Sequence, residues 1–108
     1  MLRETDAFKT WIKGLRDKAA VGVINLRIMR LAQGNPGNAE PVGEGVSELK
    51  IDFGPGYRVY YKVFADSTVI LCGGDKDDQP RSIKKAKELA EAINNLLTKQ
   101  SGNDSKNH

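Results

Sequence analysis

The sequence is poor in the side chains that most often bind metals or act as nucleophiles. Its 108 residues include one cysteine, Cys72, and one histidine, His108. With no cluster of Cys and His, the chain has no pattern for a zinc site. Cys72 sits in an apolar run with no internal histidine to activate it, so it is interpreted as a small buried thiol. We therefore predict neither a metal nor a cofactor.

Long hydrophobic segments are also missing. No apolar run reaches the length of a membrane span, and residues 1–15 are an amphipathic mixture instead of a basic end followed by a hydrophobic block. We expect a cytoplasmic protein with no membrane partner. A chain of 108 residues suits one modest core. The sequence predicts a single domain over residues 1–98 and a disordered polar tail over residues 99–108.

Two motifs fall short of known binding patterns. The segment GGDK at 73–76 lacks the GxxxxGK[ST] spacing of a phosphate-binding loop. Asp75, Asp77 and Asp78 lack the spacing of a calcium loop and precede a predicted helix, where acidic residues commonly act as caps and dipole partners. Neither motif supports a nucleotide site or a metal site.

The net charge is compatible with binding to nucleic acid, but it is unevenly distributed. The chain carries +3 at neutral pH and has a pI of about 9.1. Residues 1–42 and 80–108 each carry a net +3, whereas residues 43–79 carry −3. Attraction to phosphates would therefore come from the helical segments 16–30 and 81–87, which frame the predicted sheet.

Residues 44–79 indicate three strands of a small, mainly antiparallel sheet. Apolar and polar residues alternate over 48–53 and again over 57–64, on either side of the Gly-Pro-Gly break at 54–56. This pattern predicts a hairpin with one core face and one solvent-exposed face. The apolar run 68–72 predicts a third strand, covered on both faces and therefore central.

The charges on the hairpin favour one register. A three-residue loop satisfies both faces, because apolar residues then meet apolar residues and polar residues meet polar ones. That register sets Asp52 opposite Arg58, Lys50 opposite Tyr60 and Glu48 opposite Lys62.

Helices are predicted on both sides of these strands. An apolar stripe over 8–15, with Thr5 or Asp6 as its cap, is followed by a second helix after Asp17 that ends at Gly34. These two should form an antiparallel helical hairpin. A C-terminal helix begins near Pro80, and its predicted buried face is Ile83, Ala86, Leu89, Ile93 and Leu96 or Leu97. The predicted fold class is therefore α+β.

This order of elements, together with ELKIDFGPGYRVYYKV and VILCGGDKDDQPRSIKKAKELA, resembles the RelE/ParE toxin superfamily, and most closely its HigB-like addiction-module killer proteins. The resemblance covers nearly the whole predicted domain. It implies a RelE-like fold and the toxin of a type II toxin-antitoxin system, a metal-independent mRNA endoribonuclease (mRNA interferase) that inhibits translation on the ribosome. The implied partners are messenger RNA, the ribosome and a small antitoxin of the helix-turn-helix, HigA-like kind.

The resemblance also implies site residues. Arg58 in GYRVYY matches the position of the residue that holds the phosphate and stabilises the transition state in that family. An arginine suits this role because a guanidinium offers two parallel donors to phosphate oxygens. Lys50 in ELKI matches a catalytic lysine, and Lys76 lies where RelE places another basic group. The implied RNA-binding residues are Arg81, Tyr60, Lys62 and Lys84, with Tyr60 placed to stack on a base.

The sequence departs from the RelE pattern at two points. Asp52 stands where RelE has a second lysine, and no tyrosine or histidine follows the last strand to act as general acid. Two alternatives therefore stay open: a ParE-like poison of DNA gyrase, and an inert toxin homologue that only binds its antitoxin. Cross-strand pairs worth roughly 0.2–1 kcal/mol each would also explain the hairpin charges.

Overall fold

The predicted α+β class is confirmed by the computed structural model, which describes the backbone of residues 1–106 and the side chains of residues 1–99. His108 lies outside the described residues. The elements are β1 (Leu2–Glu4), α1 (Asp6–Lys13), α2 (Lys18–Ala32), β2 (Ala39–Gly43), β3 (Val46–Ile51), β4 (Tyr57–Phe64), β5 (Ser67–Asp75), the 3-10 turn η1 (Lys76–Asp78) and α3 (Gln79–Lys106).

The strands of the described residues form one five-stranded sheet in the order β1-β5-β4-β3-β2. β1 pairs in parallel with β5, and the other pairs are antiparallel, as the mainly antiparallel prediction requires. The predicted strand 57–64 coincides with β4. The predicted strand 68–72 lies inside β5, which is an interior strand between β1 and β4, although β4 is the middle one.

The edge strand β2 is absent from the sequence-based prediction. It contains Pro41, which has no N–H to donate and is tolerated in a sheet only at an edge or a bulge. The register with β3 shifts between Pro41 and Gly43, and the connecting turn places Gly43, Glu44 and Gly45 at positive φ. The proline therefore interrupts the strand pattern in the sequence without preventing the strand.

The loop of the β3–β4 hairpin is longer than predicted. β3 ends at Ile51 and β4 begins at Tyr57, so the loop is 52–56, closed by a hydrogen bond from the Gly56 N–H to the Phe53 carbonyl at 3.0 Å. The predicted register is wrong: Lys50 pairs with Arg58 and not with Tyr60. Because this is a shift of two residues along β4, the same side chains still share a face.

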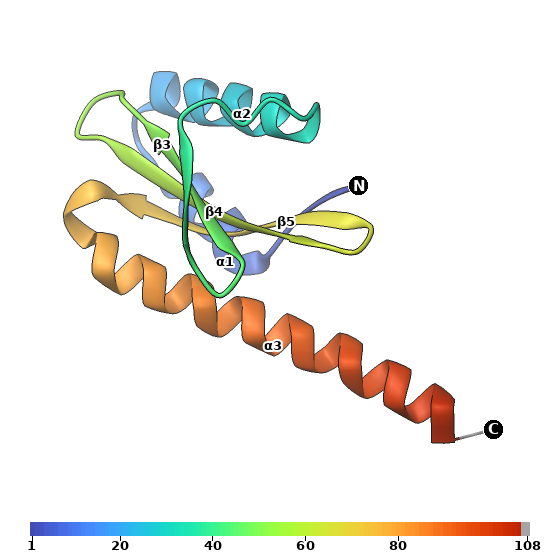
Figure 1. The fold of residues 1–108 in the computed structure, drawn as a ribbon. Coiled ribbons are helices and arrows are strands. Elements are labelled where there is room, and N and C mark those ends of the chain that lie inside the picture. The colour runs from blue at the N-terminus through green and yellow to red at the C-terminus, as the bar shows by residue number, and fades with distance from the viewer. Residues whose placement is uncertain (107–108) are drawn as a thin grey trace.

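Helices cover both faces of the sheet (Figure 1). α1 and α2 pack on the face that carries Leu49, Ile51 and Val59, and α3 packs on the opposite face against Leu71 and Tyr60. The prediction of a solvent-exposed second hairpin face is therefore wrong. That face is covered by α3, and Glu48 on it is completely buried.

Local capping sets where the first two helices begin. The Phe8 N–H donates to Thr5 Oγ1 at 3.1 Å, and Asp17 Oδ1 accepts from the N–H groups of Ala19 and Ala20 at 3.0 and 3.2 Å. Both predicted helix starts are confirmed. Buried side chains from the two helices, Phe8 among them, belong to one core cluster.

The C-terminal helix is longer than predicted. α3 spans Gln79–Lys106, so helical backbone continues past Thr98 into the segment predicted to be disordered, and only 107–108 of that segment lie outside the described backbone. Leu96 and Leu97 are 60% and 47% exposed, so the prediction that one of them is buried is wrong. The C-terminal part of α3 extends beyond the sheet (Figure 1). No described helix combines the length and apolar character that crossing a membrane requires.

Candidate functional site

A carboxylate buried beneath α3 is the centre of the candidate site. Among the side chains that the structure describes, Glu48 is the one charged group in the buried class, with no exposed surface. Gln79, the first residue of α3, donates from Nε2 to Glu48 Oε2 at 2.8 Å. Glu48 Oε1 lies 3.7 Å from Arg58 Nε. A buried carboxylate needs such partners because an isolated charge is expensive to remove from water.

Arg58 is held by neighbours on only part of its guanidinium. Its side chain is 13% exposed, and Nη1 donates to the Tyr57 carbonyl at 3.0 Å. The 3.7 Å from Nε to Glu48 is an ion-pair distance and too long for a hydrogen bond. Within the described residues Nη2 makes no hydrogen bond, so one nitrogen of the fork remains available to an anion.

Lys50 is the direct cross-strand partner of Arg58 and projects from the same face of the sheet. Its backbone is fixed on both sides: the N–H donates to the Asn38 carbonyl at 2.9 Å, and Arg27 Nη1 donates to the Lys50 carbonyl at 2.7 Å. Its ammonium lies 2.5 Å from Glu40 Oε1. Glu40 is 54% exposed, so the pair is one that water and salt weaken.

Lys76, Arg81 and Lys84 extend the cationic end of the sheet towards α3. The Lys76 N–H donates to the Gly56 carbonyl at 3.1 Å, which places Lys76 next to the start of β4, two residues before Arg58. Arg81 and Lys84 are exposed in the first turns of α3, whose N-terminus carries a partial positive charge. The structure thus gathers the three predicted catalytic residues, Arg58, Lys50 and Lys76, at one end of the sheet.

Tyr60 does not take the predicted RNA-stacking position. Its ring is completely buried against α3 and offers no face on which a base could stack. Its hydroxyl makes no hydrogen bond within the described residues. Burial first, and then the Glu48 carboxylate opposite, raise the pKa of the Tyr60 phenol well above its ordinary value. Tyr60 is therefore a neutral core residue of this site.

Lys62 lies away from the other predicted cations. It donates from Nζ to the Glu44 carbonyl at 3.3 Å, and the same nitrogen lies 5.2 Å from the centre of the Phe64 ring. It lies four positions along β4 from Arg58, roughly 13 Å at the rise of an extended strand. It can meet an RNA backbone only at a different phosphate from the one that Arg58 would hold.

The remaining side chains that the sequence singled out have structural positions. Burial raises the pKa of the Cys72 thiol to about 11, and Sγ lies 3.7 Å from the Ser82 carbonyl, so the predicted small buried thiol is confirmed. Asp75 makes no capping hydrogen bond. Within the described residues no group of three His, Cys, Asp or Glu side chains is arranged to hold a metal ion.

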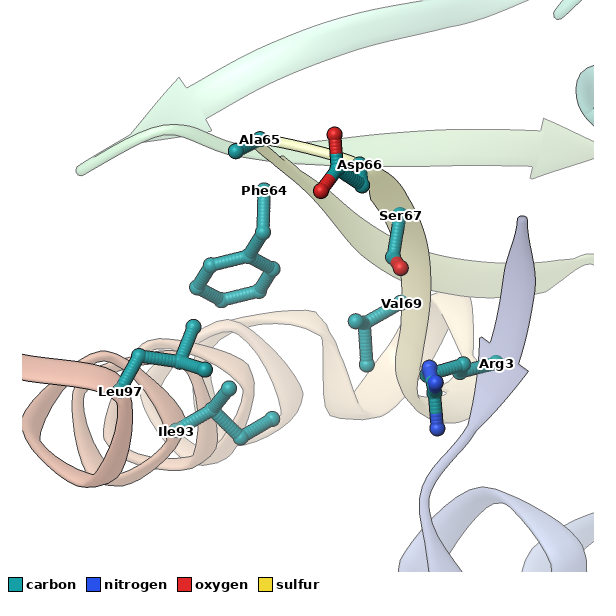
Figure 2. A pocket seen from close by; sticks show the side chains of 8 residues that line it. All are labelled: Arg3, Phe64, Ala65, Asp66, Ser67, Val69, Ile93 and Leu97. Atoms are coloured by element: carbon teal, nitrogen blue, oxygen red, sulfur yellow. The ribbon is translucent and has the colours of Figure 1, made fainter. Parts of the chain in front are cut away.

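A hollow of about 430 Å³ lies at the opposite end of the sheet (Figure 2). The β4–β5 turn, β1 and α3 border it, and Phe64 faces Ile93 and Leu97 across it. None of the seven predicted site residues lines this hollow, so it is separate from the cationic end. Its lining is Arg3, Phe64, Ala65, Asp66, Ser67, Val69, Ile93 and Leu97.

Sequence reasoning missed Glu48 and Gln79 as members of the site. In the sequence Glu48 is one polar position in an alternating strand, which is typical of a solvent-exposed face. Only the packing of α3 over that face turns it into a buried charge. Gln79 carries no signal except its place just before the predicted helix start.

An uncharacterized protein of Haemophilus influenzae is 45% identical to the chain over 93 residues, which cover 85% of this chain and 94% of that protein. No family model matches the chain, and no solved structure matches it. The similarity therefore extends over nearly all of the relative.

Proposed function

We propose that this chain, which belongs to the same family as the H. influenzae protein, is the toxin of a type II toxin-antitoxin pair and cleaves messenger RNA without a metal ion in the cytoplasm. One observation carries the proposal. Lys50 and Arg58 are direct cross-strand neighbours on one face of the sheet, and Lys76 follows at the end of the adjacent strand. Fixed cations of this kind suit the charge that develops on a phosphate during cleavage.

The chain supplies the charged groups that the electrostatic part of the reaction requires. The ribose 2′-hydroxyl loses its proton to water and its oxygen attacks the neighbouring phosphorus. The bond from phosphorus to the 5′-oxygen breaks, water protonates that oxygen, and a 2′,3′-cyclic phosphate forms. Arg58 donates to a non-bridging oxygen through its free Nη2, while Lys50 places a second positive charge beside it. Lys76 and Arg81 would hold the RNA phosphates next to the one that is cleaved.

Two features of the fold support the resemblance on which the activity rests. The order of elements, with two helices between β1 and the hairpin strands and a helix after β5, is the order from which a RelE-like fold was expected. The cationic end lies at one rim of the sheet, where an antitoxin of helix-turn-helix type could cover it. The ribosome would present the message to the same rim.

The ion pairs favour a second candidate, an inert homologue that only binds its antitoxin. Lys50 already has Glu40 as a partner, and Arg58 already faces Glu48. If RNA neither displaces Glu40 nor contacts the free side of Arg58, both cations stay paired with carboxylates of the protein. The site then does not bind or cleave RNA.

The test compares wild type with Arg58→Ala in a cell-free translation reaction, with messenger 5′ ends mapped by primer extension. We expect new 5′ ends with wild type and only trace amounts with the variant. The matched control is Arg3→Ala, an exposed arginine on β1 beside the hollow at the opposite end of the sheet, which should cut like wild type. Intact messages with all three proteins would reject the nuclease, and a gyrase supercoiling assay would then test the ParE-like alternative.

A further inference from the structure

Arg58 and Glu48 form a pair with unused hydrogen-bonding capacity. Glu48 Oε1 and Arg58 Nε face each other at 3.7 Å, and both atoms are buried without a hydrogen-bond partner in the described residues. The other oxygen of Glu48 is held by Gln79 at 2.8 Å. The carboxylate is thus tied to α3 on one side and faces the guanidinium on the other.

This arrangement is costly if its only purpose is stability. Placing a carboxylate where none of its surface meets water costs several kcal/mol, which a pair with imperfect geometry repays only in part. An apolar residue at position 48, between Val46 and the base of α3, would fill the same space without that cost. The charge is therefore better explained by what it does to Arg58.

We propose that Glu48 is a positioning residue for Arg58, and that Gln79 fixes Glu48 in turn. The carboxylate holds the Nε edge of the guanidinium inside the protein, so that Nη2 is the nitrogen presented to a phosphodiester. The identity of the anion as RNA rests on the proposed function, whereas the control of Arg58 by Glu48 does not.

The first arm of the test reads Arg58 directly and needs no activity. The Nε–H resonance of Arg58 is followed by ¹⁵N NMR, assigned by its loss in Arg58→Ala, and its exchange with solvent is compared between wild type and Glu48→Gln. The variant keeps the shape of the side chain and removes its charge. We expect exchange at least about tenfold faster in the variant, and equal rates in the two proteins would overturn the proposal.

The matched control is Glu44→Gln. Glu44 also lies 3.7 Å from a cation, Lys87, but it is 70% exposed. Its removal should leave the Arg58 resonance unchanged. If Glu48→Gln fails to fold by circular dichroism, Gln79→Ala replaces it, since Gln79 is only partly buried and its loss frees the same carboxylate. The same increase in exchange is then expected, and unchanged exchange overturns the proposal.

The second arm measures RNA cleavage under single-turnover conditions. Glu48→Gln should lower the rate at saturating RNA by about 10- to 100-fold, since a misplaced catalytic group costs that much, while affinity for RNA changes little. Combined with Arg58→Ala it should cause no further loss, because both changes remove the same interaction. Fully additive losses would overturn the proposal. If wild type cuts no RNA, the proposed function fails and the NMR arm alone decides the role of Glu48.

Discussion

The indole ring of Trp11 lies directly on Gly73, and a Cβ at Gly73 would come within 2.4 Å of two of its carbons. This contact lets α1 lie close against β5. The centroid of the Trp11 ring lies 5.9 Å from that of Phe8, on the same helix, and 6.2 Å from that of Tyr57 on β4. The first glycine of the GGDK motif is therefore a packing residue, which agrees with the absence of a phosphate-binding spacing around it.

Gly73→Ala should destabilise the fold. The added methyl must displace an aromatic ring inside a packed core, for which overpacking typically costs about 1–3 kcal/mol in the free energy of unfolding. Urea denaturation followed by circular dichroism measures this. The matched control is Gly22→Ala in α2, where an added Cβ meets nothing within 4 Å. This substitution should raise the free energy of unfolding by up to about 1 kcal/mol, because alanine favours a helix more than glycine does. Equal stability of Gly73→Ala and wild type would contradict the packing argument.

Local signals predicted the elements well. Alternation located β4 at both ends, and the capping residues Thr5 and Asp17 located the starts of two helices, because these features depend only on neighbouring residues. The hairpin register was predicted wrongly because charge pairing favoured a short loop, whereas residues 52–56 form their own turn. The face of each side chain was still predicted correctly, since register errors of two residues preserve it.

The features that the sequence predicted wrongly or missed depend on packing between distant parts of the chain. Nothing near Glu48 in the sequence shows that α3, which begins some thirty residues later, covers its face of the sheet. Tyr60 was assigned to RNA stacking for the same reason. Leu96 or Leu97 was assigned to the core because the helical pattern does not show where the sheet stops covering α3. The sequence therefore predicts which cations share a face, but not which polar groups are buried among them.

The buried thiol of Cys72 makes stability depend on pH in the alkaline range. Its pKa is raised from about 9 to about 11 by burial, so the unfolded chain loses this proton first. The stabilising contribution is complete below pH 9 and is lost as the pH rises through 11. Urea denaturation at pH 8 and pH 10 should show a smaller decline for Cys72→Ala than for wild type. An equal decline would mean that the thiol does not contribute.

The native thiol should also resist chemical modification. At pH 8 we expect Cys72 to react with a disulfide reagent only as fast as the protein unfolds, because the thiolate is scarce and the sulfur is buried. Rapid reaction in the absence of urea would contradict this. Full reaction in urea serves as the control that the reagent works.

Glu40 should compete with RNA for Lys50. Glu40→Gln removes the exposed carboxylate that lies 2.5 Å from the Lys50 ammonium, so RNA no longer has to displace it. We expect RNA affinity to rise by up to about fivefold, the equivalent of about 1 kcal/mol for an exposed ion pair, with stability changing by less than that. Filter binding at low salt measures the first and urea denaturation the second. Weaker RNA binding would show that Glu40 orients Lys50 for RNA.

Leu96, an exposed apolar residue in the C-terminal half of α3, should be dispensable for folding. Leu96 is 60% exposed, so Leu96→Gln should change the free energy of unfolding by no more than about 0.5 kcal/mol. Leu71→Ala, at a completely buried position under α3, should cost about 2–5 kcal/mol. Thermal denaturation compares the two. A large loss for Leu96→Gln would mean that this part of α3 is covered in solution.

Lys62 and Arg58 should differ in the step that each affects. Lys62 lies too far along β4 to share a phosphate with Arg58, so Lys62→Ala should weaken RNA binding and lower the salt dependence by about 0.7 in the slope of log affinity against log salt. The cleavage rate at saturating RNA should stay at the wild-type value. Arg58→Lys keeps the charge but loses the planar guanidinium that Glu48 and the Tyr57 carbonyl hold, so it should lower that rate nearly as much as Arg58→Ala. A wild-type rate in Arg58→Lys would reduce Arg58 to a point charge, and the Glu48 pairing would then have no geometry to control.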